Sequence, residues 1–180
     1  KAGSDNSNYD GYANSIYTIA VGASTRFGVS SSFSEPGANL LVVAPSGTSG
    51  GPYITTTDRT GTVGNSTSAG SSGNYYSSFS GTSAATPVVS GVVALMLEKN
   101  PNLGWRDVQE ILIRSTTKVS PADVGWHTNG AGISFNHQFG AGLVNATAAV
   151  TLSNGWTNLP GQTSLVSTQS DSISIPENSA

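Results

Sequence analysis

The segment Gly81-Thr82-Ser83-Ala84-Ala85-Thr86-Pro87 contains a serine, Ser83, whose position would suit a catalytic nucleophile. Ser83 lies three residues before a stretch, 86–100, whose apolar spacing predicts a helix. The start of a helix leaves backbone N–H groups free and carries the positive end of the helix dipole. Both features favour an alkoxide nucleophile and the oxyanion of a tetrahedral intermediate. The alternative interpretation is that Ser83 only caps the helix.

A serine nucleophile also requires a base, which is usually a histidine oriented by a carboxylate. The only histidines are His127 and His137. The order Ser83, Asp123 and then either histidine is that of an α/β-hydrolase, which would make the protein an esterase. That fold places its nucleophile in a Gly-x-Ser-x-Gly turn, but Ala85 stands where the second glycine would be. Both histidines are therefore expected to fill structural positions.

The composition excludes several classes of partner. Only 9% of the 180 residues are charged and the net charge is −3, so no basic stripe for nucleic acid is available. No apolar run approaches the roughly 20 residues of a membrane span. Without cysteine the chain forms neither disulfides nor thiolate metal sites.

Short apolar runs and helical periodicities outline an α/β architecture. Residues 15–21 and 40–44 are predicted as strands, and the continuous apolar character of the second is typical of a parallel sheet. The helix expected over 86–100 carries apolar residues widely enough to be buried on most sides. Two further helices are expected at about 105–115 and 145–152, and the segment 130–142 is expected to be extended with glycine hinges.

Four segments, in the same order along the chain, carry a family resemblance. The nucleophile segment resembles that of subtilisin-like serine proteases. Three further segments resemble the kexin/furin branch of that family. They are residues 5–18, Asn100-Pro101-Asn102-Leu103-Gly104-Trp105-Arg106-Asp107-Val108-Gln109 and His137-Gln138-Phe139-Gly140-Ala141-Gly142-Leu143. The resemblance implies that residues 1–159 are the C-terminal part of a subtilase catalytic domain with a mainly parallel sheet. Residues 160–180 are expected to be a linker and the first strand of a truncated P-type β-sandwich domain.

The resemblance assigns the catalytic serine to Ser83 and places the catalytic Asp, the His and the oxyanion Asn before Lys1. It implies a calcium-dependent serine endopeptidase, secreted or periplasmic, that is active only together with an N-terminal chain of the same protease. The alternative is a non-catalytic, calcium-stabilised secreted fragment with a structural or binding role.

Substrate contacts are assigned by the same resemblance. Asp10 is placed at the base of the primary specificity pocket, where a carboxylate would pair with an Arg or Lys side chain of the substrate. Peptides and proteins with basic residues are therefore the expected substrates. Tyr12 resembles the wall of a more distal subsite, and Gly81 and Thr82 are expected to contact the substrate beside Ser83.

Two cation sites follow from the resemblance as well. Asp5 and Glu35 match positions that bind Ca²⁺ in this branch, and carboxylate oxygens are the ligands that Ca²⁺ prefers. The backbone around Ala13, Ser15 and Thr18 resembles a monovalent-cation site, expected to hold Na⁺. Ala13 departs from the usual threonine there, but a carbonyl ligand would survive that change.

Overall fold

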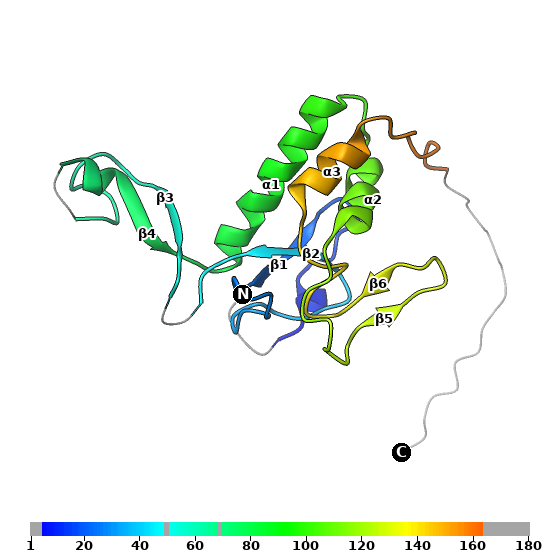
Figure 1. Ribbon diagram of the computed structural model, residues 1–180, viewed down its shortest axis with the longest axis horizontal. Helices are drawn as coiled ribbons and strands as arrows, with labels where there is room; N and C mark the ends of the chain where they lie inside the picture. The colour runs from blue at the N-terminus through cyan, green and yellow to red at the C-terminus, as the bar shows by residue number, and fades with distance from the viewer. Residues whose placement is uncertain (1–4, 49–50, 68–69, 164–180) are drawn as a thin grey trace, which may run out of the picture.

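A short parallel sheet forms the centre of the computed structural model, which describes residues 5–48, 51–67 and 70–163 (Figure 1). Strand β1 (Ala20–Ser24) pairs in parallel with β2 (Leu40–Pro45). On the other side of β2, Val43 forms a parallel bridge to Leu143, which in turn bridges Thr117. The apolar run predicted at 40–44 is confirmed as a buried parallel strand, with Val42, Val43 and Ala44 fully enclosed.

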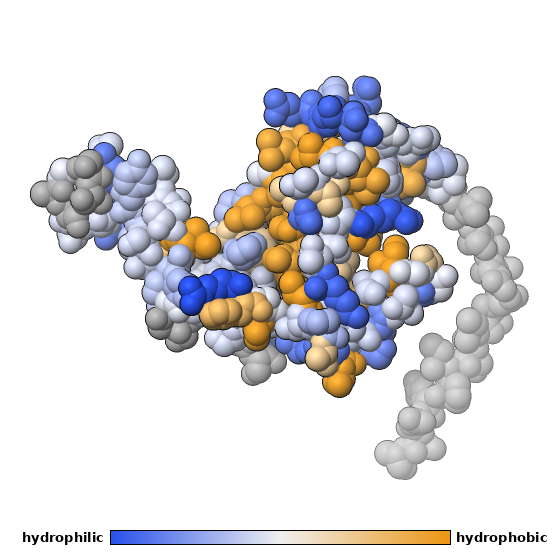
Figure 2. All heavy atoms as spheres, viewed as in Figure 1, coloured by the Kyte–Doolittle hydropathy of each residue, from blue (hydrophilic) through white to orange (hydrophobic). Residues whose placement is uncertain are grey.

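Helix α1 (Thr82–Lys99) lies against both strands of this sheet. Its buried side chains recur at helical spacing, and they are Ala84, Ala85, Val89, Val92 and Met96. The expectation that this helix is buried on most sides is wrong for the described chain, because Val88 and Leu95 remain 38% and 48% exposed. Figure 2 shows hydrophobic residues gathered on the face of the molecule where α1 lies in Figure 1.

Helices α2 (Trp105–Ser115) and α3 (Ala146–Ser153) complete the core and lie close to their predicted positions. The α2 side chains Val108, Ile111 and Leu112 pack into the same apolar cluster as the buried face of α1. None of the helices among the described residues is long and apolar enough to cross a membrane.

A buried carboxylate ties the start of α2 to the segment after α3. Asp107 is 3% exposed and accepts hydrogen bonds from the backbone N–H of Gly104 (2.8 Å), the indole N–H of Trp156 (3.0 Å) and the backbone N–H of Leu159 (2.7 Å). Burial alone would raise the pKa of Asp107, but these hydrogen bonds and the nearby Arg106 outweigh it and lower the pKa below its ordinary value of 3.8.

The strand predicted from residue 15 is wrong at its beginning. Residues 15–18 form turns in which Ser15 N–H donates to the Tyr12 carbonyl at 3.2 Å and Thr18 N–H donates to the Ser15 carbonyl at 3.1 Å. Hydroxyl side chains add local hydrogen bonds to these turns, and such bonds compete with a strand ladder. The strand therefore begins only at Ala20.

Two hairpins project from the sheet and helices. Strand β3 (Ile54–Thr57) pairs with β4 (Tyr75–Phe79), with the 3-10 helix η2 (Gly70–Asn74) just before β4. This arm, which sequence reasoning missed, stands away from the other elements and leads directly into α1 (Figure 1). Strands β5 (His127–Thr128) and β6 (Ser134–Phe135) form the smaller hairpin, and only β6 lies within the segment 130–142 that was expected to be extended. Of the expected linker and first P-domain strand, 160–180, only residues 160–163 are described, so the predicted strand lies outside the described residues.

Candidate active site

Ser83 lies in the first turn of α1 with its side chain exposed. The helix begins at Thr82, four residues earlier than predicted, because Gly81 takes the N-cap position. Ala84 and Ala85 are buried and hold this turn against the sheet. No side-chain capping bond is found at this helix start among the described residues, so the interpretation of Ser83 as a helix cap is wrong.

Gly81 gives the chain the conformation that presents Ser83. Its φ of 86° lies in the region that only glycine adopts without strain. Its carbonyl accepts hydrogen bonds from the Ala84 N–H at 3.0 Å and from the Ser46 hydroxyl, just after β2, at 2.8 Å. Ser46 was not predicted as a site residue, since nothing in its local sequence indicates that its hydroxyl reaches the start of α1.

The turn that carries Ser83 also lacks one ordinary helix hydrogen bond. Pro87 lies inside α1, and its ring nitrogen has no hydrogen to donate to the carbonyl of Ser83 four residues earlier. Thr86 keeps its side chain local by donating its hydroxyl to the Thr82 carbonyl at 2.9 Å. The first turn therefore offers free N–H groups, an exposed hydroxyl and the positive end of an 18-residue helix in one place.

A small cavity of about 130 Å³ lies next to this turn and brings together residues that are distant in sequence. Asp10, Glu35 and Thr82 all contribute to its walls. Asp10 follows the 3-10 helix η1 (Ser7–Tyr9), and its Oδ1 accepts the N–H groups of Tyr12 and Ala13, both at 2.9 Å. The predicted specificity carboxylate thus shares a cavity with Thr82, the neighbour of the predicted nucleophile.

The predicted calcium ligands lie on two segments that are hydrogen bonded to each other. Ser7 N–H donates to the Pro36 carbonyl at 2.9 Å, and these two residues are close neighbours of Asp5 and Glu35. Glu35 is buried, and its Oε1 has no hydrogen-bond partner among the described residues. A buried carboxylate oxygen without a donor fits a hard cation. No cluster of three or more candidate metal ligands occurs in the part of the chain that the structure describes, so these two side chains would supply only part of a calcium site.

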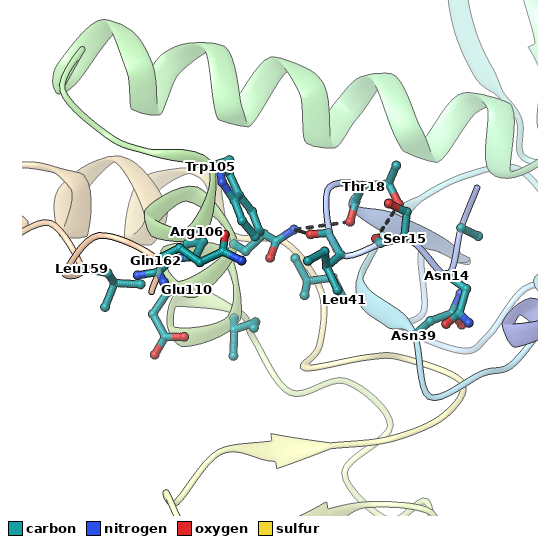
Figure 3. Close-up of a pocket in the computed structure, with 14 residues that line it drawn as sticks. Asn14, Ser15, Thr18, Asn39, Leu41, Trp105, Arg106, Glu110, Leu159 and Gln162 are labelled. Carbon is teal, nitrogen blue, oxygen red and sulfur yellow. Dashed lines mark hydrogen bonds between the residues drawn. The ribbon is translucent and has the colours of Figure 1, made fainter. Parts of the chain in front are cut away.

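The segment with the predicted monovalent-cation site lines a second, wider cavity of about 720 Å³ (Figure 3). Ala13, Ser15 and Thr18 all lie on its wall. The Ser15 carbonyl already accepts the N–H of Thr18 at 3.1 Å and its hydroxyl at 2.9 Å. The side chain of Tyr12, the predicted distal subsite wall, is 87% exposed.

The histidines do not form a site with Ser83. His127 lies in β5 and His137 shortly after β6, and Figure 1 shows the β5–β6 hairpin apart from the start of α1, with β1 and β2 between them in this view. Both side chains are exposed. The Asp123 carboxylate accepts the Gly125 N–H at 2.8 Å and the Asn136 amide at 2.9 Å, and neither bond reaches a histidine. This geometry removes the basis for an α/β-hydrolase triad.

Comparisons with known proteins agree on one family. Residues 2–142 match the family model described as the subtilase family, Peptidase S8. The chain is 42% identical over 166 residues to human proprotein convertase subtilisin/kexin type 7, covering 91% of this chain and 20% of that protein. It is 39% identical over 161 residues to the dibasic-processing endoprotease of Yarrowia lipolytica, covering 89% of this chain and 16% of that protein.

Solved structures show the same likeness in three dimensions. A serine protease of Aeromonas sobria superposes with a TM-score of 0.78 at 28% identity, over 88% of this chain and 33% of that one. The chain spans about a fifth of the length of the curated relatives it matches.

Proposed function

The chain belongs to the subtilase family and is similar to its kexin/furin branch, and from this premise we propose that it supplies the nucleophile Ser83 to a calcium-dependent serine endopeptidase that cleaves after basic residues. The observation that carries the proposal is the exposed Ser83 hydroxyl on the first turn of α1, beside a cavity that Asp10 lines.

In this proposal Ser83 Oγ attacks the carbonyl carbon of the scissile peptide bond while its proton passes to a histidine base. The negative charge that develops on the carbonyl oxygen is stabilised by the Ser83 N–H at the positive end of α1. The amine then leaves with the proton from the histidine, and water hydrolyses the resulting ester. The family pattern puts the histidine, its aspartate and an oxyanion asparagine in an N-terminal part of the protease.

Asp10 is proposed to select the basic residue. Its carboxylate would pair with the guanidinium of Arg or the ammonium of Lys in the cavity beside Thr82. Gly81 and Thr82 would contact the peptide next to the scissile bond, and the exposed Tyr12 would contact it further away. The name of the Yarrowia lipolytica relative, a dibasic-processing endoprotease, supports a basic substrate without deciding whether this chain requires a basic pair.

Calcium is proposed to bind at Asp5 and Glu35 with further ligands from the N-terminal part. It would neutralise the buried Glu35 carboxylate and hold the two segments joined by the Ser7–Pro36 hydrogen bond. A sodium ion bound by backbone oxygens of Ala13, Ser15 and Thr18 stays a prediction from the resemblance, as does a secreted or periplasmic location.

The N-terminal chain of the same protease is the proposed partner of α1. Val88 and Leu95 leave apolar surface on this helix that no described part of the chain covers. Helices that are apolar all round are normally enclosed, so this face fits the interior of a larger domain.

Replacement of the hydroxyl tests the proposal directly. In the protease that contains both parts, Ser83→Ala should lower kcat for an arginyl peptide by at least about a thousandfold, because no other group in the site can form the ester. Ser90→Ala, a change of the same type on an exposed serine of α1, should leave kcat unchanged. Full activity in Ser83→Ala would contradict the proposal.

A further inference from the structure

The loop that carries the proposed specificity carboxylate is tied to helix α2 by the side chains of Gln109 and Trp105. The amide Nε2 of Gln109 donates to the Ile16 carbonyl at 3.1 Å and to the Thr18 carbonyl at 3.4 Å. These contacts join residues more than 90 positions apart in sequence. Next to them, the rings of Tyr17 and Trp105 meet edge to face with their centroids 5.2 Å apart.

The hydrogen bonds continue from this contact to Asp10. The Thr18 hydroxyl donates to the Tyr12 carbonyl at 2.7 Å, sharing its proton with the Ser15 carbonyl at 2.9 Å. The Tyr12 N–H donates to Asp10 Oδ1 at 2.9 Å. A chain of hydrogen bonds therefore runs from Gln109 through Thr18 and Tyr12 to the carboxylate.

The Gln109 amide helps to fix where this loop lies relative to α2, through two exposed hydrogen bonds. The cavity of about 720 Å³ separates much of this loop from α2, and Figure 3 shows Ser15, Thr18 and Trp105 on its wall. Most other hydrogen bonds of residues 10–18 join residues close in sequence. They fix the shape of the loop but not its position relative to α2. The long-range contacts of Gln109 and Trp105 place it against the helix.

We infer that Gln109 is a positioning residue for substrate specificity, which holds the loop so that Asp10 faces the charged end of the substrate's basic side chain. The inference rests on the proposed role of Asp10 and adds to it a residue remote from the substrate. Gln109 contacts neither substrate nor Ser83. Its effect is expected on the binding of the basic side chain and not on the chemical step.

The test measures kcat/KM in the protease with both parts present. Two peptides are compared that are identical except for the residue before the scissile bond, which is arginine in one and its neutral isostere citrulline in the other. Gln109→Glu keeps the shape of the side chain but removes the amide donor, and Gln109→Met removes it without adding charge. Each should lower kcat/KM for the arginyl peptide about 3- to 10-fold, through KM, and leave the citrullyl peptide within about twofold. Gln138→Glu, the same change at an exposed glutamine, should alter neither value.

A double-mutant cycle tests the path through Thr18. Thr18→Val removes the hydroxyl while nearly keeping the shape of the side chain. Because Thr18 and Gln109 act along one path, the fold-loss in kcat/KM of the double variant Thr18→Val with Gln109→Glu should be smaller than the product of the two single fold-losses. The inference would be overturned if the double variant lost kcat/KM by the full product of the two single losses. It would also be overturned if kcat/KM fell equally for the arginyl and the citrullyl peptide.

Asp10→Asn separates the two proposals. If it abolishes the preference for arginine while the Gln109 variants leave that preference intact, only the positioning role fails. If Asp10→Asn itself leaves the preference unchanged, the specificity proposal fails and the positioning role fails with it.

Discussion

At the scale of single residues, Glu35 is a buried carboxylate with one oxygen that no described hydrogen-bond donor reaches. Such a group is costly unless a proton or a cation neutralises it. Its neighbour in the proposed site, Asp5, is exposed, so Glu35 is the ligand whose loss should matter more for the protein's stability.

The calcium proposal predicts a change in thermal stability for Glu35→Gln. Saturating Ca²⁺ should raise the thermal midpoint of the unaltered protease by about 5–10 °C relative to chelator, as expected for a ligand at about 100 times its Kd. Glu35→Gln should lose most of this increase, whereas Glu98→Gln, at an exposed position on α1, should keep it. An undiminished calcium effect in Glu35→Gln would argue against this ligand.

Residue types alone made Ser83 a candidate nucleophile, because a serine followed by small residues at the start of a helical pattern has suitable surroundings, but its catalytic role was assigned from the resemblance and stays a prediction. They were not sufficient for Gln109 or Ser46. Each makes its contact across a long sequence separation, at least 35 residues, which no local pattern encodes. The assignments of Asp10, Asp5 and Glu35 came from the resemblance and remain predictions, although the structure places Asp10 and Glu35 around one cavity.

At the scale of elements, α2 is fixed at its start by the carboxylate of Asp107 and along its length by the apolar cluster. The three donors to Asp107 come from the N-cap of α2 and from the segment after α3. The carboxylate therefore links α2 to the segment after α3, together with apolar contacts and the hydrogen bond from the Arg106 side chain to the Pro160 carbonyl.

The lowered pKa of Asp107 gives this link a pH dependence of known sign. A carboxyl group with a lower pKa in the folded than in the unfolded protein stabilises the fold above the unfolded pKa, and the contribution is lost as the pH falls through the folded value. Asp107→Asn should lower the thermal midpoint at pH 7 by about 4–8 °C, corresponding to about 2 kcal/mol. The difference should shrink below pH 3.8; a difference that stays constant with pH would contradict this assignment.

Elements that bury a continuous apolar run were predicted well, and those set by turns were not. Strand β2 and helices α2 and α3 lie close to where their apolar spacing indicates. The segment before β1 has a similar apolar pattern, but the Ser15 and Thr18 hydroxyls stabilise turns there. The arm of β3 and β4 was missed because threonine, serine and glycine dominate its sequence, and these residues occur as readily in loops.

At the scale of the whole molecule, the described chain leaves apolar surface of its central helix uncovered. The wide apolar pattern of α1 predicted burial on most sides, yet Val88 and Leu95 are partly exposed. Both observations agree if another part of the protease covers this face. In the proposed function, the same part supplies the histidine, aspartate and asparagine.

The most direct measurement is to label the protease with a peptidyl phosphonate that ends in an arginine analogue and to locate the adduct by mass spectrometry. We predict one adduct, on Ser83, that forms in the presence of the N-terminal part and does not form on this chain alone. A citrulline analogue should react more slowly, because it lacks the charge that Asp10 is proposed to bind. Labelling at another residue, or no labelling of Ser83 in a preparation that cleaves arginyl peptides, would contradict the assignment of the nucleophile.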